Sequence, residues 1–237
     1  MKISLIDERV SEKIERRLQI LGFLPIRMPK SDALPSDVAS HPDILLFKDG
    51  NTVITSASYA ESALYVFSDL REHRDDLRLV FSSDDFGNKY PRDAIFNALV
   101  MGRYIFLKED SISKSVLEYA DENRLIRVNV KQGYPRCTVL PLNDKMAITS
   151  DKGMAKALHG VGVNVLTISE GQVSLPTREY GFIGGAAGVF ENTVYFLGSI
   201  EKHPDFEKIR DFIALAGMDF VSLSDEMLFD GGTILFL

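Results

Sequence analysis

The chain has 237 residues, of which 45% are hydrophobic and 26% charged, as in folded globular proteins and unlike disordered segments. Its 27 basic and 34 acidic residues give a formal charge of −7, and no basic run carries interleaved aromatics, so we expect no nucleic acid partner. No apolar run approaches the roughly 20 residues that cross a bilayer, and the first apolar stretch is too short for a secretory signal. We therefore expect a cytoplasmic protein without a membrane partner.

Cysteine and histidine usage limits the classes of site that the chain can build. Cys137 is the only cysteine, which excludes an internal disulfide. The histidines are scattered along the chain without the spacing typical of metal ligands. We therefore expect no metal site and no cofactor. The four histidines are His41, His73, His159 and His203.

The beginning of the chain predicts a strand at residues 2–6, a helix at about 11–21 and a second strand at 23–28. Ser11 is a favourable residue to cap the start of this helix, because its hydroxyl can accept a hydrogen bond from a free backbone N–H. Gly22 follows the helix, where glycine accepts the left-handed turn that often ends one.

A short motif then recurs at intervals of 49, 44, 48 and 47 residues, each time at the start of an apolar run. Repeats of this length indicate that one structural unit is used several times. The copies are His41-Pro42-Asp43-Ile44, Tyr90-Pro91-Arg92-Asp93, Tyr134-Pro135-Arg136-Cys137, Phe182-Ile183-Gly184-Gly185 and Phe229-Asp230-Gly231-Gly232.

Each motif is followed by the same series of patterns: two short β-rich runs, a helical stretch and a further β-rich run. The third unit predicts these elements at 138–140, 146–149, 152–159 and 163–168. The fourth predicts them at 188–190, 194–197, 204–216 and 220–223. The second contributes 104–107, 113–120 and 125–130.

The two ends of the chain supply complementary parts of one unit. After Phe229 the chain has room for only a single strand, at 233–237, and the first 40 residues supply the strand, helix and strand that this unit lacks. An apolar terminal strand left unpaired would be a sticky edge. We therefore expect it to pair with the N-terminal strand and close a ring of five ββαβ units, forming one α/β domain over residues 1–237. The alternative is an open, doubly wound α/β sheet in which the similarities are accidental.

This arrangement resembles the pentein superfamily, which includes arginine and agmatine deiminases, dimethylarginine hydrolases and amidinotransferases. The stretch from Tyr90 to Asp93 is similar to the aromatic-x-Arg-Asp stretch of the deiminases, which implies that Asp93 grips a guanidinium group. Gly231-Gly232 is similar to the glycine pair that precedes their nucleophilic cysteine. The resemblance points to a bacterial branch of the superfamily separate from these named enzymes.

Two departures from the pentein pattern bear on activity. Residues 233–237 contain no nucleophile, and residues 182–187 contain no histidine to act as a general base. We therefore expect no deiminase or amidinotransferase activity that relies on those two positions.

The candidate site residues all come from the repeated motif. Successive residues of an extended strand point to opposite faces, so an extended motif would turn Asp93 towards a central tunnel and Arg92 away from it. By the repeat, Cys137 would face the tunnel from the next unit. Asp43 and Asp230 occupy motif positions too.

Each candidate has an alternative role. Asp93 can instead cap a backbone N–H, and Cys137 can be an ordinary buried thiol. Arg92 and Arg136 share a motif position and can bind an anionic group or pair with carboxylates between units. The glycine pairs favour close backbone approach or space for a ligand.

The leading hypothesis for function is a protein that binds a small cationic ligand, with a guanidino or amino group, in the central tunnel. One alternative is a module that binds a protein partner and does no chemistry. Another is a divergent guanidine hydrolase that uses Cys137.

Overall fold

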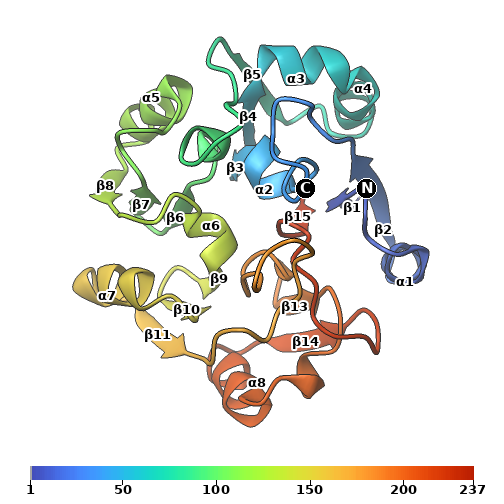
Figure 1. Cartoon of the computed structure of the whole chain (residues 1–237), viewed down its shortest axis with the longest axis vertical. Coiled ribbons are helices and arrows are strands. Elements are labelled where there is room, and N and C mark those ends of the chain that lie inside the picture. The colour runs from blue at the N-terminus through green and yellow to red at the C-terminus, as the bar shows by residue number, and fades with distance from the viewer. Residues whose placement is uncertain (1) are drawn as a thin grey trace.

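The structure, a computed structural model, describes residues 2–237, in which five small sheets lie around a common centre (Figure 1). In every sheet the middle strand is antiparallel to the first and parallel to the outer one. Parallel neighbours cannot be joined by a tight turn, so a helix connects the middle strand to the outer strand. The predicted α/β fold of five ββαβ units is confirmed, and an open doubly wound sheet is ruled out.

The strands keep the same order in each unit, and the first strands lie towards the centre, where β6 contacts β9, β9 contacts β12 and β12 contacts β15. In the order first, middle and outer, the sheets are β3 (Phe47–Asp49), β4 (Thr52–Ser56), β5 (Arg78–Ser82); β6 (Leu99–Met101), β7 (Tyr104–Leu107), β8 (Ile126–Asn129); β9 (Val139–Asn143), β10 (Met146–Thr149), β11 (Asn164–Thr167); β12 (Ala187–Phe190), β13 (Thr193–Phe196), β14 (Asp219–Ser222); and β15 (Leu235–Phe236), β1 (Lys2–Asp7), β2 (Phe23–Met28).

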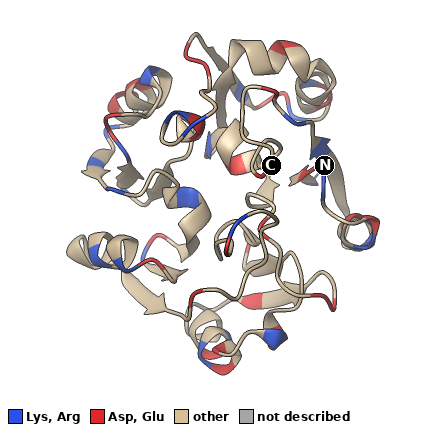
Figure 2. Ribbon diagram, viewed as in Figure 1, with Lys and Arg blue, Asp and Glu red and all other residues tan. Residues whose placement is uncertain are grey.

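The connecting helices lie on the outside of the molecule, and most charged residues lie on these helices and on loops (Figure 2). Ser11 caps the first of them by accepting a hydrogen bond from the N–H of Ile14, as its sequence position predicts. No helix of residues 2–237 has both the length and the apolar character needed to cross a bilayer. In chain order the helices are α1 (Glu12–Ile20), α3 (Ala57–Ser62), α4 (Leu64–His73), α5 (Lys114–Glu122), α7 (Lys152–Gly160), the 3₁₀ helix η2 (Ile200–Lys202) and α8 (Phe206–Leu215).

The two ends of the chain form one sheet, as predicted. Strand β15 pairs antiparallel with β1, with Ser4 opposite Phe236 and Leu5 opposite Leu235. Backbone hydrogen bonds between Ile3 and Leu237 extend this pairing to the last residue. The N and C labels accordingly lie close together in Figure 1.

Aromatic packing reinforces the junction between the two ends. The ring of Phe236 lies 4.8 Å from that of Phe23, 5.6 Å from Phe190 and 5.2 Å from Tyr195, centroid to centroid. Each such pair typically contributes about 0.5–1.5 kcal/mol beyond area burial. The terminal strand is thus held by a side chain of β2, in its own sheet, and by side chains of β12 and β13 in the fourth unit.

The expectation that the repeated motifs are extended is wrong for the first three copies. They form short helical turns, α2 (Pro42–Leu45), the 3₁₀ helix η1 (Arg92–Ala94) and α6 (Pro135–Thr138). In α2 and α6 a proline at the first helical position favours this outcome, because its fixed φ suits a helix and its missing N–H would have no partner there. The first strand of each unit therefore begins after the turn, and the turn carries the candidate side chains.

Candidate functional site

A cavity of about 150 Å³, here called the central cavity, lies where the turns α2 and α6 meet the loop that precedes β12. Both turns lie near the middle of the ring of units (Figure 1). Aromatic, apolar and ionisable side chains share its wall. The cavity is lined by Val38, His41, Ile44, Tyr134, Cys137, Leu175, Arg178, Tyr180, Phe182 and Asp230.

Asp230 is the buried carboxylate of the cavity wall. Its Oδ2 accepts the backbone N–H of Phe182 at 2.8 Å, and its Oδ1 accepts the N–H of Gly232 at 3.1 Å. Gly185 leaves room for it, since a Cβ there would lie 2.0 Å from Oδ1. Burial raises the pKa of Asp230, and nearby His41 partly opposes that rise.

His41 lies beside Asp230 and is equally buried. Its Nε2 is 3.7 Å from Oδ2 of Asp7 and its Nδ1 is 3.9 Å from Oδ1 of Asp230, too far for hydrogen bonds. Neither ring nitrogen has a hydrogen-bond partner. Burial lowers the pKa of His41, although the carboxylates of Asp230 and Asp7 favour the charged ring.

A glycine allows the backbone to pass close to this histidine. Gly232 has φ +64°, and a Cβ at that position would lie 2.2 Å from the Cβ of His41. A Cβ on Gly184 would lie 2.3 Å from the carbonyl oxygen of Val139. These glycines serve close backbone and side-chain packing, which confirms one of the two roles expected for the glycine pairs.

Cys137 contributes a buried thiol from α6. Its Sγ accepts a hydrogen bond from Nδ2 of Asn97 at 3.1 Å. Burial raises the pKa of the thiol well above its ordinary value, and the carboxyl groups of Asp43 and Asp230 raise it further. The thiol is therefore protonated at neutral pH, unlike the thiolate of an activated cysteine nucleophile.

Asp43 lies on α2 behind the cavity wall and is buried too. The hydroxyl of Thr233 donates to its Oδ2 at 2.8 Å, whereas Oδ1 has no hydrogen-bond partner. Burial raises the pKa of Asp43, and the guanidinium of Arg136 partly offsets this. One ligand atom from each of His41, Asp43 and Cys137 lies within 4.8 Å of the others, and these three residues are here called the central cluster.

Asp93 lies further from the cavity. Its Oδ2 accepts a hydrogen bond of 2.6 Å from the hydroxyl of Tyr134, which does line the cavity, and its Oδ1 has no partner. Burial raises the pKa of Asp93 despite the hydrogen bond from Tyr134.

The two arginines of the motif do not meet at the site. Arg92 is exposed and does not line the central cavity. Arg136 is partly buried near Asp43, and its guanidinium donates to the carbonyl of Val139 at 3.2 Å. Within residues 2–237 neither arginine forms an ion pair with a carboxylate, so the expected pairing between units is not observed.

The fold thus brings Asp43, Cys137 and Asp230 together, connects Asp93 to them through a tyrosine and leaves Arg92 outside. His41 was not among the residues predicted for the site, although it begins the first copy of the motif. The same motif position holds Tyr134 in a later unit, and each of these two residues is followed by a proline. That alignment was the available signal, since Tyr134 and His41 both line the cavity.

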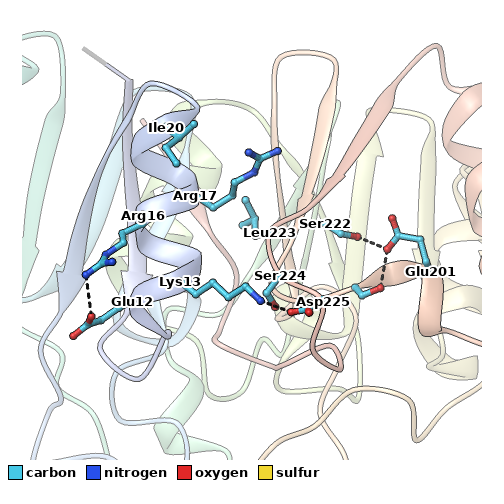
Figure 3. A pocket seen from close by; sticks show the side chains of 11 residues that line it. Glu12, Lys13, Arg16, Arg17, Ile20, Glu201, Ser222, Leu223, Ser224 and Asp225 are labelled. Carbon is cyan, nitrogen blue, oxygen red and sulfur yellow. Dashed lines mark hydrogen bonds and ion pairs between the residues drawn. The ribbon is translucent and has the colours of Figure 1, made fainter.

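A larger hollow of about 890 Å³ lies between α1 and the loop that follows β14 (Figure 3). Its charged side chains are mostly exposed and pair with one another: Figure 3 shows Lys13 reaching Asp225 across the hollow, and Arg16 pairing with Glu12. Exposed ion pairs of this kind contribute little free energy. The hollow lacks the buried, unpaired polar atoms that distinguish the central cavity, which is therefore the better candidate site.

Comparison with solved structures shows what this fold resembles. Dimethylarginine dimethylaminohydrolase from Pseudomonas aeruginosa, as a mutant complexed with citrulline, has a TM-score of 0.58 at 9% identity, covering 94% of this chain and 91% of that chain. Agmatine deiminase from C. jejuni, with substrate bound, has a TM-score of 0.54 at 10% identity, with coverages of 99% and 92%. An amidinotransferase from Microseira wollei has a TM-score of 0.55 at 12% identity, with coverages of 91% and 74%.

At these identities the likeness concerns the fold, and all three structures are penteins. No curated protein matches the chain in sequence. Residues 5–235 match the model of a family of unknown function, DUF6873. The chain therefore belongs to the DUF6873 family and has the five-unit α/β fold of the pentein superfamily.

Proposed function

We propose that the central cavity binds a small cationic molecule that carries a guanidino or amino group. The observation that carries this proposal is the buried carboxylate of Asp230 in a wall otherwise rich in aromatic rings, those of Tyr134, Tyr180 and Phe182. A carboxylate supplies charge-assisted hydrogen bonds to such a group, and aromatic faces attract cations. An engineered cavity of about 150 Å³ holds benzene, so this one has room for a guanidinium or a small amine.

The electrostatics around the cavity favour a cation. Asp43, Asp93 and Asp230 are all buried, and burial raises the pKa of each. A bound cation would offset the cost of keeping a carboxylate charged in this environment. Arg178 also lines the cavity, but Asp37 pairs with its guanidinium and so reduces its repulsion of a cation.

The fold neighbours support the same class of ligand. Their names describe a dimethylarginine dimethylaminohydrolase, an agmatine deiminase and an amidinotransferase. A shared fold alone does not transfer an activity, so the proposal depends on the cavity and takes from the neighbours only the choice of ligands to test.

Thermal unfolding of the protein with arginine, agmatine or putrescine tests the proposal. A chelator is present throughout, so that bound metal ions do not contribute to the result. A ligand at 100 times its dissociation constant stabilises the folded state by about 2.7 kcal/mol. Citrulline is the matched control for arginine, because its neutral ureido group replaces the guanidinium. Stabilisation by the cations and not by citrulline is expected, and no response to any cation at millimolar concentration would refute the proposal.

A second candidate function is hydrolysis of a guanidino compound by Cys137, favoured by the position of its thiol beside His41 in the cavity wall. Attack on the guanidino carbon requires a thiolate. Burial opposes loss of the thiol proton, and burial also lowers the pKa of His41, the nearest candidate base. Ligand binding without hydrolysis is therefore the better supported of the two candidate functions. Release of ammonia or an amine from arginine or agmatine, and its loss in a Cys137→Ala variant, would reverse that order.

A further inference from the structure

We propose that the central cluster of His41, Asp43 and Cys137 is a zinc site with three protein ligands and a fourth position open to the central cavity. The cluster joins two units of the fold: Asp43 lies on α2 with His41 just before it, and Cys137 lies on α6. This inference goes beyond ligand binding by Asp230 and does not depend on it.

The geometry of the cluster suits tetrahedral coordination. One ligand atom from each residue lies within 4.8 Å of the other two. Zinc bonds of about 2.0–2.3 Å place neighbouring tetrahedral ligands roughly 3.5 Å apart. A contraction of up to about 1.3 Å would form the site, within the reach of small side-chain rotations. All three side chains are at most 3% exposed, so water competes little for the ion.

Unpartnered buried atoms give independent support. Nδ1 and Nε2 of His41 and Oδ1 of Asp43 have no hydrogen-bond partner, although all three are buried. Buried polar atoms without partners are rare in folded proteins and call for an explanation such as an ion. A zinc ion would take one histidine nitrogen and one carboxylate oxygen as ligands.

The surroundings of the cluster resemble the outer shell of a metal site. Metal-bound histidines usually donate their second N–H to a carboxylate, and His41 has Asp7 on its Nε2 side and Asp230 on its Nδ1 side. The ring nitrogen that does not bind the ion would therefore face a carboxylate. Asn97 donates to the sulfur of Cys137, and Thr233 donates to the second oxygen of Asp43.

The ligand types select the metal. A thiolate and an imidazole together with one carboxylate suit zinc, whereas calcium and magnesium prefer oxygen ligands throughout. One thiolate and one carboxylate carry two negative charges, which balance the two positive charges of Zn²⁺. The ion would displace the thiol proton of Cys137 on binding, because the thiolate is the metal ligand. His41 and Cys137 line the cavity but Asp43 does not, so the open coordination position faces the cavity.

The competing explanation is a purely structural histidine, held by the carboxylates of Asp7 and Asp230 without any metal. Zinc titration of chelator-treated protein, with calorimetry and thermal unfolding as readouts, separates the two. We expect one equivalent of Zn²⁺ to bind and to raise the melting temperature. Substitution of Co²⁺ should give the visible bands of a tetrahedral ion and an ultraviolet thiolate-to-cobalt band.

Variants then assign the ligands. Loss of an outer-shell partner weakens metal sites about 10- to 100-fold, so Cys137→Ser and Asp43→Asn should each weaken Zn²⁺ binding at least about 100-fold. His159→Asn, at an exposed histidine of α7, is the matched control and should bind as the unaltered protein does. The proposal would be overturned if Cys137→Ser bound Zn²⁺ as tightly as the unaltered protein does. It would also be overturned if the His159→Asn control lost as much Zn²⁺ affinity as the ligand variants.

The cobalt spectrum keeps the test decisive if a variant fails to fold, because it uses the unaltered chain. A spectrum without the thiolate band, or no binding of Zn²⁺ at all, would refute the site. The ligand screen proposed above runs in the presence of a chelator, so failure of the zinc site and failure of cation binding give different results.

Discussion

The hydroxyl of Thr233 lies 2.8 Å from Oδ2 of Asp43 and also 2.8 Å from the carbonyl oxygen of Gly184. The hydroxyl has a single proton, so it can donate to either of these two buried oxygens but to only one at a time. The contact connects the segment before β15 to the first and fourth units.

We expect Thr233→Val to lower the free energy of unfolding by about 2 kcal/mol, because it leaves buried acceptors without their donor. Both side chains are β-branched, so any strain from the φ of +71° at this position is common to the two proteins. Thr233→Ser keeps the hydroxyl and should be nearly neutral. Urea denaturation measures both, and a valine variant as stable as the serine variant would contradict the hydrogen-bond argument.

We expect Gly185→Ala to destabilise the fold and to displace Asp230, since a Cβ there would lie 2.0 Å from Oδ1. Overpacking of this kind typically costs about 1–3 kcal/mol. Gly160→Ala is the control, because Gly160 ends α7 with nothing within 4 Å of an added Cβ. It should be neutral or slightly stabilising. Denaturation curves that rank the two variants equally would show that Gly185 is not a packing requirement.

We expect Asp230→Asn to weaken binding of arginine or agmatine about 10- to 100-fold, the range that corresponds to loss of a hydrogen bond to a charged group. Each variant is compared with its own ligand-free melting temperature, because the substitution also disturbs the backbone contacts of Asp230. Asp110→Asn, at an exposed carboxylate, is the control and should bind as before. Undiminished binding by Asp230→Asn would place the ligand elsewhere.

We expect the thiol of Cys137 to react with iodoacetamide only when the protein unfolds, because the side chain is 3% exposed and its pKa is raised. The labelling rate should therefore rise with urea in parallel with the unfolded fraction. Ser68→Cys in a Cys137→Ala background supplies an exposed cysteine that should react at once. Rapid labelling of Cys137 in the native protein would instead favour the hydrolase alternative.

We expect Asp205→Asn to destabilise the protein by about 1 kcal/mol at neutral pH. Hydrogen bonds from the N–H of Ser169 and from Lys208 hold the pKa of Asp205 well below 3.8. A carboxyl group with a depressed pKa in the folded state stabilises above its unfolded pKa and loses that contribution as the pH falls. The difference in free energy of unfolding between the unaltered protein and the variant should therefore shrink below about pH 3.8. A deficit that stays constant between pH 7 and pH 2 would contradict this linkage.

Short-range patterns were enough to predict most elements. Strands β2, β7 and β10 lie at the predicted bounds, and α1 begins directly after its predicted cap, Ser11. The motif turns were not predicted, because alternation of side chains applies only to an extended motif, whereas α2 and α6 are helical turns that start at a proline. Proline favours a first helical turn there, and this changed which side chains face the centre.

The sequence by itself determined the number of units, their order of strands and helix, and the pairing of the two ends, because these follow from periodicity and from the need to bury apolar strands. Only the tertiary structure decided that His41, Asp43 and Cys137 meet, that Asp230 joins the cavity wall and that Arg92 stays outside. The reason is physical: the segments around His41, Cys137 and Asp230 are far apart in the chain, and their contacts depend on how the turns of different units pack against one another. No local pattern encodes that packing.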